Sequence, residues 1–383
     1  MEAENSPKRN LEICVVSPKV TAYLIKNSTA SAGGAQRQQS MVYSEMSDRG
    51  YDISAIVDNY NGKDTNVVDG IKLVEGVSGS ISGIPSIIKS LYGLFSAMVN
   101  LSSDVYVVRG APRLAAATFL ICKTLRARFV FRVANDSDVD FSYLKNRYPA
   151  FFLPFYSLAV SGADAVITQT ECQSFLLMEN FGVEAFQIPN GYDLPDAGEL
   201  HPPEDRGHVL WVGSSDPKKK NPNLFIELAK RLPDINFTMI SQPIEGKENV
   251  HDKLRQKAYM VENLEFKGEV DPDKVHGYYR TAKLLVNTSE YEGFPNTFLE
   301  AWRYETPVVS LYFDLDGLLE NEIGGMRAGS MENLTSIVEK LALNEFCRTN
   351  LGKEGRSYMK ENYSLPEVVD LYEEVFDNVY LLV

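Results

Sequence analysis

Residues 289–301 have the sequence SEYEGFPNTFLEA, which predicts one βα unit. A short apolar run comes directly before this stretch and is typical of a buried strand. Gly293 and Pro295 then predict a tight turn, and Asn296 is a residue type that favours the N-cap of a helix. The stretch therefore joins the end of a strand to the start of a helix.

The start of this helix suits a phosphate-bearing ligand, because its free N–H groups and positive dipole end attract anions. Glu292 lies before the turn and Glu300 about one helical turn inside the helix, so both carboxylates can border the same anion site. Carboxylates accept hydrogen bonds from the paired hydroxyls of a ribose or a sugar ring. The alternative is a loop acid and a helix-surface acid without a ligand, and the stretch alone leaves both open.

Strand-like and helix-like segments alternate on both sides of this unit. The predicted strands are 11–17, 52–57, 105–108, 128–133, 165–168, 208–212, 237–241, 264–267, 283–287 and 308–311. The predicted helices are 35–49, 84–100, 113–125, 171–180, 223–231, 297–304 and the region from about 332 to 383. This alternation predicts the α/β class with parallel sheets.

The chain of 383 residues is longer than one hydrophobic core usually serves. A Pro- and Gly-rich segment near 188–207 predicts a linker. We expect one Rossmann-like domain over 1–195, a second over 208–364, and a last helix, 365–383, that returns to the first domain. Two doubly wound domains facing an interdomain cleft predict a small-molecule enzyme, because ligands bind at the carboxyl ends of such strands.

The net charge of −14 argues against a general nucleic-acid binder and is typical of a surface that serves solubility. One stretch has the opposite charge and contains no acid: Arg109, Arg113, Lys123, Arg126, Arg128 and Arg132. This stretch is either a solvated helix face or a surface that meets a phosphate or an anionic lipid.

Two further features bear on the compartment. No metal-site spacing links the four cysteines: Cys14, Cys122, Cys172 and Cys347. Three of them lie in apolar contexts, which predicts buried thiols in a reducing compartment. Residues 1–10 are polar, without the apolar segment of a secretory signal, and no apolar run is long enough to span a bilayer. We expect a cytoplasmic protein, with peripheral contact to the inner face of the membrane as an open alternative.

Residues 147–156, RYPAFFLPFY, combine aromatic side chains with positive charge. Packing against the domain core is the common explanation, whereas an exposed stretch would indicate contact with a membrane interface and a lipid-linked acceptor.

The D-x-D patterns at 136–138, 138–140 and 314–316 resemble metal-binding triplets, but such short patterns arise often by chance. We therefore expect neither a metal nor another cofactor.

Several stretches carry a family resemblance. Glu292 and Glu300 form an E-x7-E pattern within EGFPNTFLEA, and TPVV follows at 306–309. VVSP, the GGAQRQ loop, IPNGYD, WVGSSDPKKKNP and FKGEV occur in matching order along the rest of the chain. Together they resemble the retaining group-1 (family 4) nucleotide-sugar glycosyltransferases, which have the two-domain GT-B fold.

The resemblance implies roles for individual residues. Glu300 would bind the donor ribose, and Glu292 would contact the transferred sugar. The diphosphate would be held at Gly293, Phe294, Pro295, Asn296 and Thr297, with close backbone approach at the glycines Gly33, Gly34 and Gly213. The donor would be a nucleoside-diphosphate sugar, and the acceptor a glycan or a lipid-linked glycan.

Two departures from the family pattern concern catalysis. Ser214 stands where the family has an arginine, and Lys220 remains as the cation for the leaving diphosphate, with Lys218, Lys219 or Arg109 as substitutes. Positioned cations stabilise such a leaving group by several kcal/mol. A catalytically weak homologue that binds a nucleotide sugar or serves as a partner subunit is therefore the main alternative.

The second departure is the absence of the histidine that many members carry in the first domain. Asn135 and Asp136 occupy the corresponding stretch and could make polar contacts to the sugar. No general base can be assigned, which suits a retaining reaction in which the donor phosphate takes the acceptor proton. A sugar phosphorylase or epimerase of similar architecture is a more remote alternative.

Overall fold

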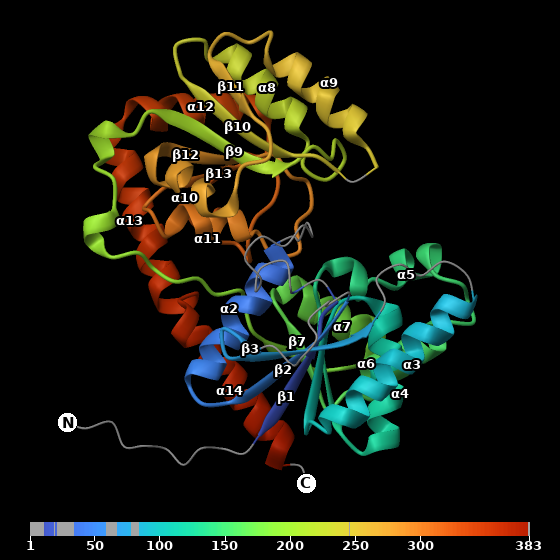
Figure 1. Cartoon of the computed structure of the whole chain (residues 1–383). Coiled ribbons are helices and arrows are strands. Elements are labelled where there is room, and N and C mark those ends of the chain that lie inside the picture. The colour runs from blue at the N-terminus through green and yellow to red at the C-terminus, as the bar shows by residue number, and fades with distance from the viewer. Residues whose placement is uncertain are drawn as a thin grey trace, which may run out of the picture. The chain divides into compact units, whose positions relative to one another are not determined.

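A computed structural model describes residues 11–18, 20, 34–58, 67–77, 84–244 and 246–381. The chain divides into two compact units (Figure 1). Unit 1 comprises Met1–Gly191 and Leu365–Val383, and unit 2 comprises Tyr192–Ser364. Each unit has a largely parallel sheet covered by helices, so the predicted α/β class with Rossmann-like domains is confirmed. The first break lies at Gly191, a few residues before the boundary expected at 195.

The sheet of unit 1 has the order β3-β4-β2-β1-β5-β6-β7-β8. Its strands are β1 (Glu12–Val16), β2 (Asp52–Asp58), β3 (Val67–Val68), β4 (Ile71–Val77), β5 (Val105–Arg109), β6 (Arg128–Arg132), β7 (Ala165–Thr168) and β8 (Phe186–Gln187). All pairs are parallel except β3 with β4. The central strands are continuous apolar runs because helices bury both of their faces.

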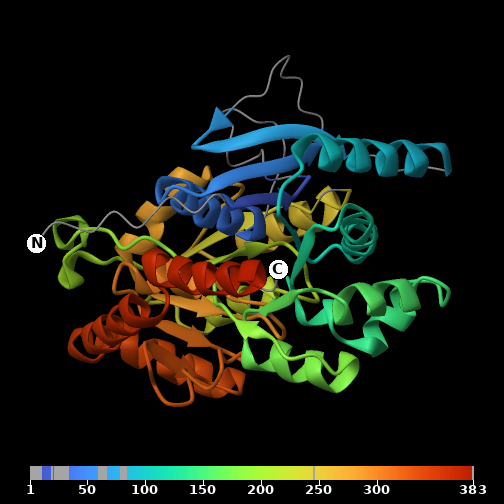
Figure 2. The same cartoon turned by 90° about the horizontal axis from the view of Figure 1, so that it is seen from below.

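Alternate side chains of β1 enter different cores. Ile13 and Val15 belong to the core beneath α2 (Gly34–Asp48) and α14 (Leu365–Leu381). Cys14 and Val16 belong to the core on the opposite face of the sheet. That second face is covered by α3 (Ile84–Leu101), α4 (Pro112–Leu125), α6 (Leu153–Ser161) and α7 (Glu171–Phe181). Figure 2 shows α3 beside α4, which is seen almost end-on.

Helix α14 packs beside α2 although more than 300 residues separate them in sequence (Figure 1). Arg49, just after α2, forms ion pairs with Asp370 and Glu373 and donates a hydrogen bond to the carbonyl of Pro366 at 3.0 Å. The rings of Tyr43 and Tyr372 lie 6.3 Å apart in the core below. These contacts make the end of the chain an integral part of unit 1.

The sheet of unit 2 is parallel and has the order β11-β10-β9-β12-β13-β14. Its strands are β9 (His208–Ser214), β10 (Phe237–Gln242), β11 (Leu264–Lys267), β12 (Ala282–Asn287), β13 (Val308–Ser310) and β14 (Gly325–Arg327). Its helices are α8 (Pro222–Arg231), α9 (Glu248–Ala258), α10 (Pro272–Thr281), α11 (Asn296–Trp302), α12 (Met331–Leu343) and α13 (Glu345–Asn362). The order places β9 and β12 side by side at the centre.

Candidate donor site in unit 2

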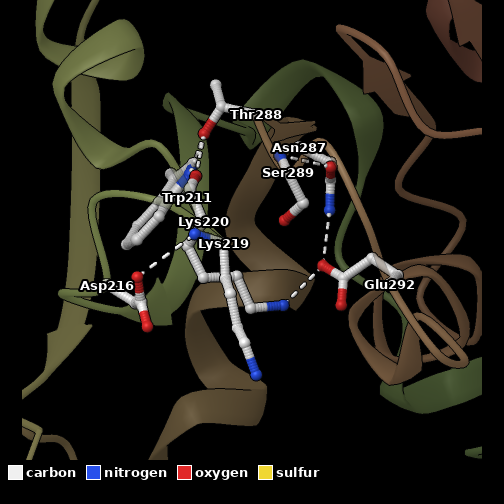
Figure 3. Close-up of polar contacts among 8 residues, drawn as sticks. All are labelled: Trp211, Asp216, Lys219, Lys220, Asn287, Thr288, Ser289 and Glu292. Carbon is white, nitrogen blue, oxygen red and sulfur yellow. Dashed lines mark hydrogen bonds and ion pairs between the residues drawn. The ribbon is translucent and has the colours of Figure 1, made fainter. Parts of the chain in front are cut away.

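The loops that follow β9 and β12 bring Lys220 and Glu292 together (Figure 3). The two strands are parallel neighbours, so their carboxyl ends lie at the same edge of the sheet. The loop after β9 contains Lys220, and the loop after β12 contains Glu292. This edge is the usual ligand-binding position in open α/β sheets.

Lys220 and Glu292 form an ion pair between Nζ and Oε1. Their side chains are 25% and 10% exposed, so the pair is shielded from solvent but still reachable. The Asn287 amide also donates to Oε1 of Glu292, at 3.3 Å. The carboxylate is therefore oriented by one cation and one amide before any ligand arrives.

Hydrogen bonds from β12 and β9 hold the backbone on both sides of this pair. Thr288 Oγ1 donates to the carbonyl of Lys220 at 2.6 Å and accepts a bond from Trp211 Nε1 at 2.9 Å. The backbone N–H of Ser289 donates to Asn287 Oδ1 at 2.9 Å. Asn287, Thr288 and Ser289 were not predicted as site residues, although a polar run at the end of a buried strand could have indicated them.

Of the three consecutive lysines, Lys220 is the one that reaches Glu292. Asp216 accepts backbone N–H bonds from Lys218 at 2.9 Å and Lys219 at 3.2 Å. Burial raises the pKa of Asp216, but these bonds and the lysine charges outweigh it and lower the pKa below its usual value. Asp216 thus shapes the loop, while the side chain of Lys219 points away from Glu292 (Figure 3).

Gly213 lies near the end of β9, next to the unusual Ser214. A Cβ atom at Gly213 would come within 2.9 Å of the Trp211 ring. This glycine is therefore required for packing around Trp211, whether or not a ligand approaches it. Its expected part in donor binding stays a prediction.

The turn before α11 differs in detail from the expectation. Asn296 is the first residue of α11 and not its N-cap; Pro295 takes the cap position, without a side-chain cap bond. The N–H of Asn296 donates to the carbonyl of Phe294 at 3.0 Å, and Pro295 has no N–H. Among the residues expected to hold a diphosphate, Thr297 lies in the first turn of α11, where backbone N–H groups have no acceptor within the helix.

Glu300 has different partners from Glu292. Its Oε1 accepts a bond from the hydroxyl of Tyr192 at 3.1 Å. The ring of Tyr192 is buried, and the guanidinium of Arg303 lies 5.9 Å from its centre. Tyr192 was missed by the sequence analysis, although it belongs to the quoted IPNGYD stretch. That both carboxylates border one anion site stays a prediction.

The remaining expected site residues lie in unit 1. Arg109 ends β5 and donates to Gln169 Oε1 at 2.8 Å, and burial together with neighbouring Arg132 lowers its pKa to about 9. Gln173 donates to Asp136 at 3.2 Å; burial raises the pKa of Asp136 despite this bond.

Three other expected positions belong to the same unit. Asn135 precedes the short 3-10 helix Asp136–Asp138, and Gly34 is the first residue of α2. Gly33 lies outside the described residues. Arg109 as a substitute cation, and Asn135 and Asp136 as sugar contacts, stay predictions.

Among the aspartates of the D-x-D patterns, Asp138 and Asp314 bind backbone groups. Asp138 accepts N–H bonds from Ala134 and Asn135 at 2.9 and 3.0 Å, and Asp314 accepts from Leu319 and Glu320 at 2.9 Å. Within the described ranges, no three His, Cys, Asp or Glu side chains cluster as metal ligands would. No helix in the described part of the chain has the length and apolar character of a membrane span.

Comparison with known proteins places this site in a family segment. Residues 196–316, which include Lys220, Glu292 and Glu300, match the family model described as glycosyl transferases group 1. The lipopolysaccharide core biosynthesis glycosyltransferase LpsE of Rhizobium meliloti is 26% identical over 183 residues, 46% of this chain. That alignment spans about half of LpsE, 52% of its length. An uncharacterized glycosyltransferase of Haemophilus influenzae is 23% identical over 93% of this chain and 99% of its own.

Solved structures show the same fold over nearly the whole chain. Sucrose-phosphate synthase from Thermosynechococcus elongatus superimposes with a TM-score of 0.77 at 16% identity, covering 97% of this chain and 100% of that one. Anabaena HepE in complex with UDP and glucose gives 0.71 at 13% identity, with coverages of 96% and 99%. Residues 196–316 of unit 2 therefore match the group 1 glycosyltransferases, and the chain as a whole has the GT-B fold of solved glycosyltransferase structures.

Proposed function

We propose that this glycosyltransferase moves a sugar from a nucleoside-diphosphate donor to a hydroxyl of a glycan or lipid-linked acceptor, with retention at the anomeric carbon. The observation that carries the proposal is the shielded Lys220–Glu292 ion pair at the carboxyl edge of the unit 2 sheet. The pair offers one cation for phosphate and one carboxylate for sugar hydroxyls, which are the two chemistries of such a donor.

In the proposed reaction, the bond between the anomeric carbon and the β-phosphate oxygen breaks. The acceptor oxygen bonds to the same carbon on the same face, and its proton moves to the released phosphate oxygen. Lys220 turns from Glu292 to the diphosphate, where negative charge accumulates. Glu292 then accepts hydrogen bonds from the transferred sugar, and Glu300 accepts them from the ribose.

Two comparisons support the choice of substrates. HepE, which shares the fold, contains UDP and glucose. LpsE is named for lipopolysaccharide core biosynthesis, which favours a glycan acceptor here. We propose that the acceptor binds unit 1 near Asn135 and Asp136. We also propose that the reaction uses no metal or cofactor and that the protein contacts a membrane peripherally.

The test is a panel of nucleoside-diphosphate sugars, measured for thermal stabilisation and slow hydrolysis with and without EDTA. We expect one donor to stabilise the chain and to be hydrolysed equally in both conditions, with the released sugar retaining its anomeric configuration by NMR. Glu292→Gln should abolish most hydrolysis, whereas Glu290→Gln, an exposed acid in the same loop, should not. Failure of every donor to bind would refute the proposal.

A catalytically weak homologue remains the second candidate, because Ser214 replaces the family's arginine beside the donor loop. It predicts thermal stabilisation by a donor without turnover, even with acceptors present. Under that outcome Ser214→Arg should restore turnover, because it returns a cation to the end of β9.

A further inference from the structure

Helix α3 has apolar side chains on both of its sides. Its inner side places Leu94, Ala97 and Met98 in the core against the sheet. Its outer side exposes a second apolar stripe at helical spacing: Ile87, Ile88, Leu91, Tyr92, Phe95 and Val99. Tyr92 and Ile88 are 72% and 62% exposed. A helix that packs against a sheet with one side only normally has a polar outer face, so this exposed apolar stripe requires an explanation.

The neighbouring helices continue the exposed apolar surface. Leu120 of α4 and Phe155 and Leu158 of α6 are exposed, and Phe151, directly before α6, is 75% exposed. Helices α3, α4 and α6 pack in that order over one face of the sheet, on the same side of unit 1 (Figures 1 and 2). We call the outer side of α3, α4, α5 (Phe141–Arg147) and α6 the α3–α6 surface.

The aromatic segment 147–156 contributes to both core and surface. Phe152 stacks between Tyr148 and Tyr156, with ring centres 5.3 and 6.3 Å apart. Phe151 and Phe155 point outward and are exposed. The segment therefore packs partly into the core and is partly exposed, and its contact with a membrane stays a prediction.

The α3–α6 surface is basic in an acidic protein. None of these four helices contains an Asp or Glu, while they carry five basic residues: Lys89, Arg113, Lys123, Lys145 and Arg147. Lys123 lies 3.9 Å from Asp164, which partly offsets its charge. The Arg113 guanidinium lies 5.7 Å from the Tyr148 ring, so positive charge directly borders the aromatic segment.

The opposite face of unit 1 has the reverse charge. All charged residues of helix α14 are acidic: Glu367, Asp370, Glu373, Glu374 and Asp377. Unit 1 is therefore polarised across its sheet, with a basic apolar side and an acidic polar side. Near an anionic plane, this polarity turns the basic side toward the plane and the acidic side away.

We propose that the α3–α6 surface binds the headgroup region of a bilayer that contains anionic lipids. Exposed aliphatic and aromatic side chains enter the interface, and the surrounding lysines and arginines contact lipid phosphates. A second copy is the weaker occupant, because identical basic surfaces would repel each other. This proposal rests on the proposed function for its purpose, since it would present unit 1 to an acceptor anchored in the membrane.

The experiment is cosedimentation of the full chain with vesicles of two compositions. We expect binding to an equal mixture of phosphatidylglycerol and phosphatidylcholine, weakening at high salt, and little binding to phosphatidylcholine alone. Ile88→Glu/Tyr92→Glu should lower the partition coefficient about tenfold or more, because two inserted apolar groups are replaced by charges. The matched control is Tyr259→Glu/Met260→Glu in unit 2, whose side chains are similarly exposed at 66% and 82%.

Equal loss of binding in the control, or equal binding to both vesicle types, would overturn the proposal. Concentration-dependent dimerisation that Ile88→Glu/Tyr92→Glu abolishes, without vesicle binding, would assign the surface to a second copy instead. Donor hydrolysis is measured in parallel without vesicles and should be unchanged in both variants. Vesicle binding by a chain that hydrolyses no donor would refute the proposed function while leaving this surface standing.

Discussion

Replacing Lys220 with methionine removes the cation beside Glu292 but keeps an unbranched side chain of similar length. The Glu292 carboxylate, only 10% exposed, then depends on the Asn287 amide at 3.3 Å. Losing one partner of a fully buried ion pair costs about 3–5 kcal/mol, and of a fully exposed pair about 0–1 kcal/mol. The intermediate exposure of this pair leads us to expect a loss of about 2 kcal/mol in the free energy of unfolding.

The effect on turnover has a separate cause. If Lys220 stabilises the departing diphosphate, its removal takes away one preorganised electrostatic contact, worth about 3 kcal/mol in the transition state. We therefore expect kcat to fall about a hundredfold, with a smaller change in KM for the donor, since the contact strengthens as charge develops. Initial rates with the donor found in the panel measure the turnover, and urea unfolding measures the stability.

Two variants separate these effects. Lys219→Met alters an exposed neighbouring lysine whose bond to Asp216 uses its backbone, so stability and turnover should both be retained. Lys220→Met/Glu292→Gln should recover most of the lost stability, because no unpaired carboxylate remains, but none of the turnover. The reasoning is refuted if Lys220→Met retains full kcat, or if Lys219→Met loses as much.

Glu300→Gln should raise KM for the donor about tenfold with little change in kcat, because a charged acceptor of ribose hydrogen bonds becomes a neutral one. Steady-state kinetics measures both constants, and an unchanged KM would contradict the assignment of Glu300 to the ribose. Burial lowers the pKa of His208 from 6.5 to about 4, so its contribution to stability is present above pH 6.5 and is lost as pH falls toward 4. Urea unfolding gives the free energy of unfolding at pH 7 and at pH 5, and the decrease between them should be about 2 kcal/mol smaller in His208→Phe than in the wild type. Equal decreases in the two proteins would show that His208 is not the cause.

The fold class was predictable because buried parallel strands leave a strong local signal. The runs Val105–Val108 in β5 and Ala165–Ile167 in β7 are continuous and apolar, and a helix follows each of them. Strands β4 and β14 were missed because IKLVEGV contains two charges and GMR is very short. Helix α9 was missed because it is mostly polar and buries only two residues, Leu254 and Ala258.

The residue types of the candidate site were also predictable, but their pairing was not. The family resemblance favoured Lys220 as the cation, with Lys218 and Lys219 as substitutes. Its pairing with Glu292, 72 residues away, depends on the path of the loop around Asp216. The bond from Tyr192 to Glu300 joins positions 108 residues apart.

The same limit applies to surfaces. The sequence predicted a helix over 84–100, where α3 lies, but the sheet order determines which of its apolar stripes packs inward and which is exposed beside α4 and α6. Secondary structure follows from interactions within a few residues, so local patterns suffice to predict it. Side-chain pairing and exposure depend on which elements become neighbours, and that order is set by packing of the whole domain.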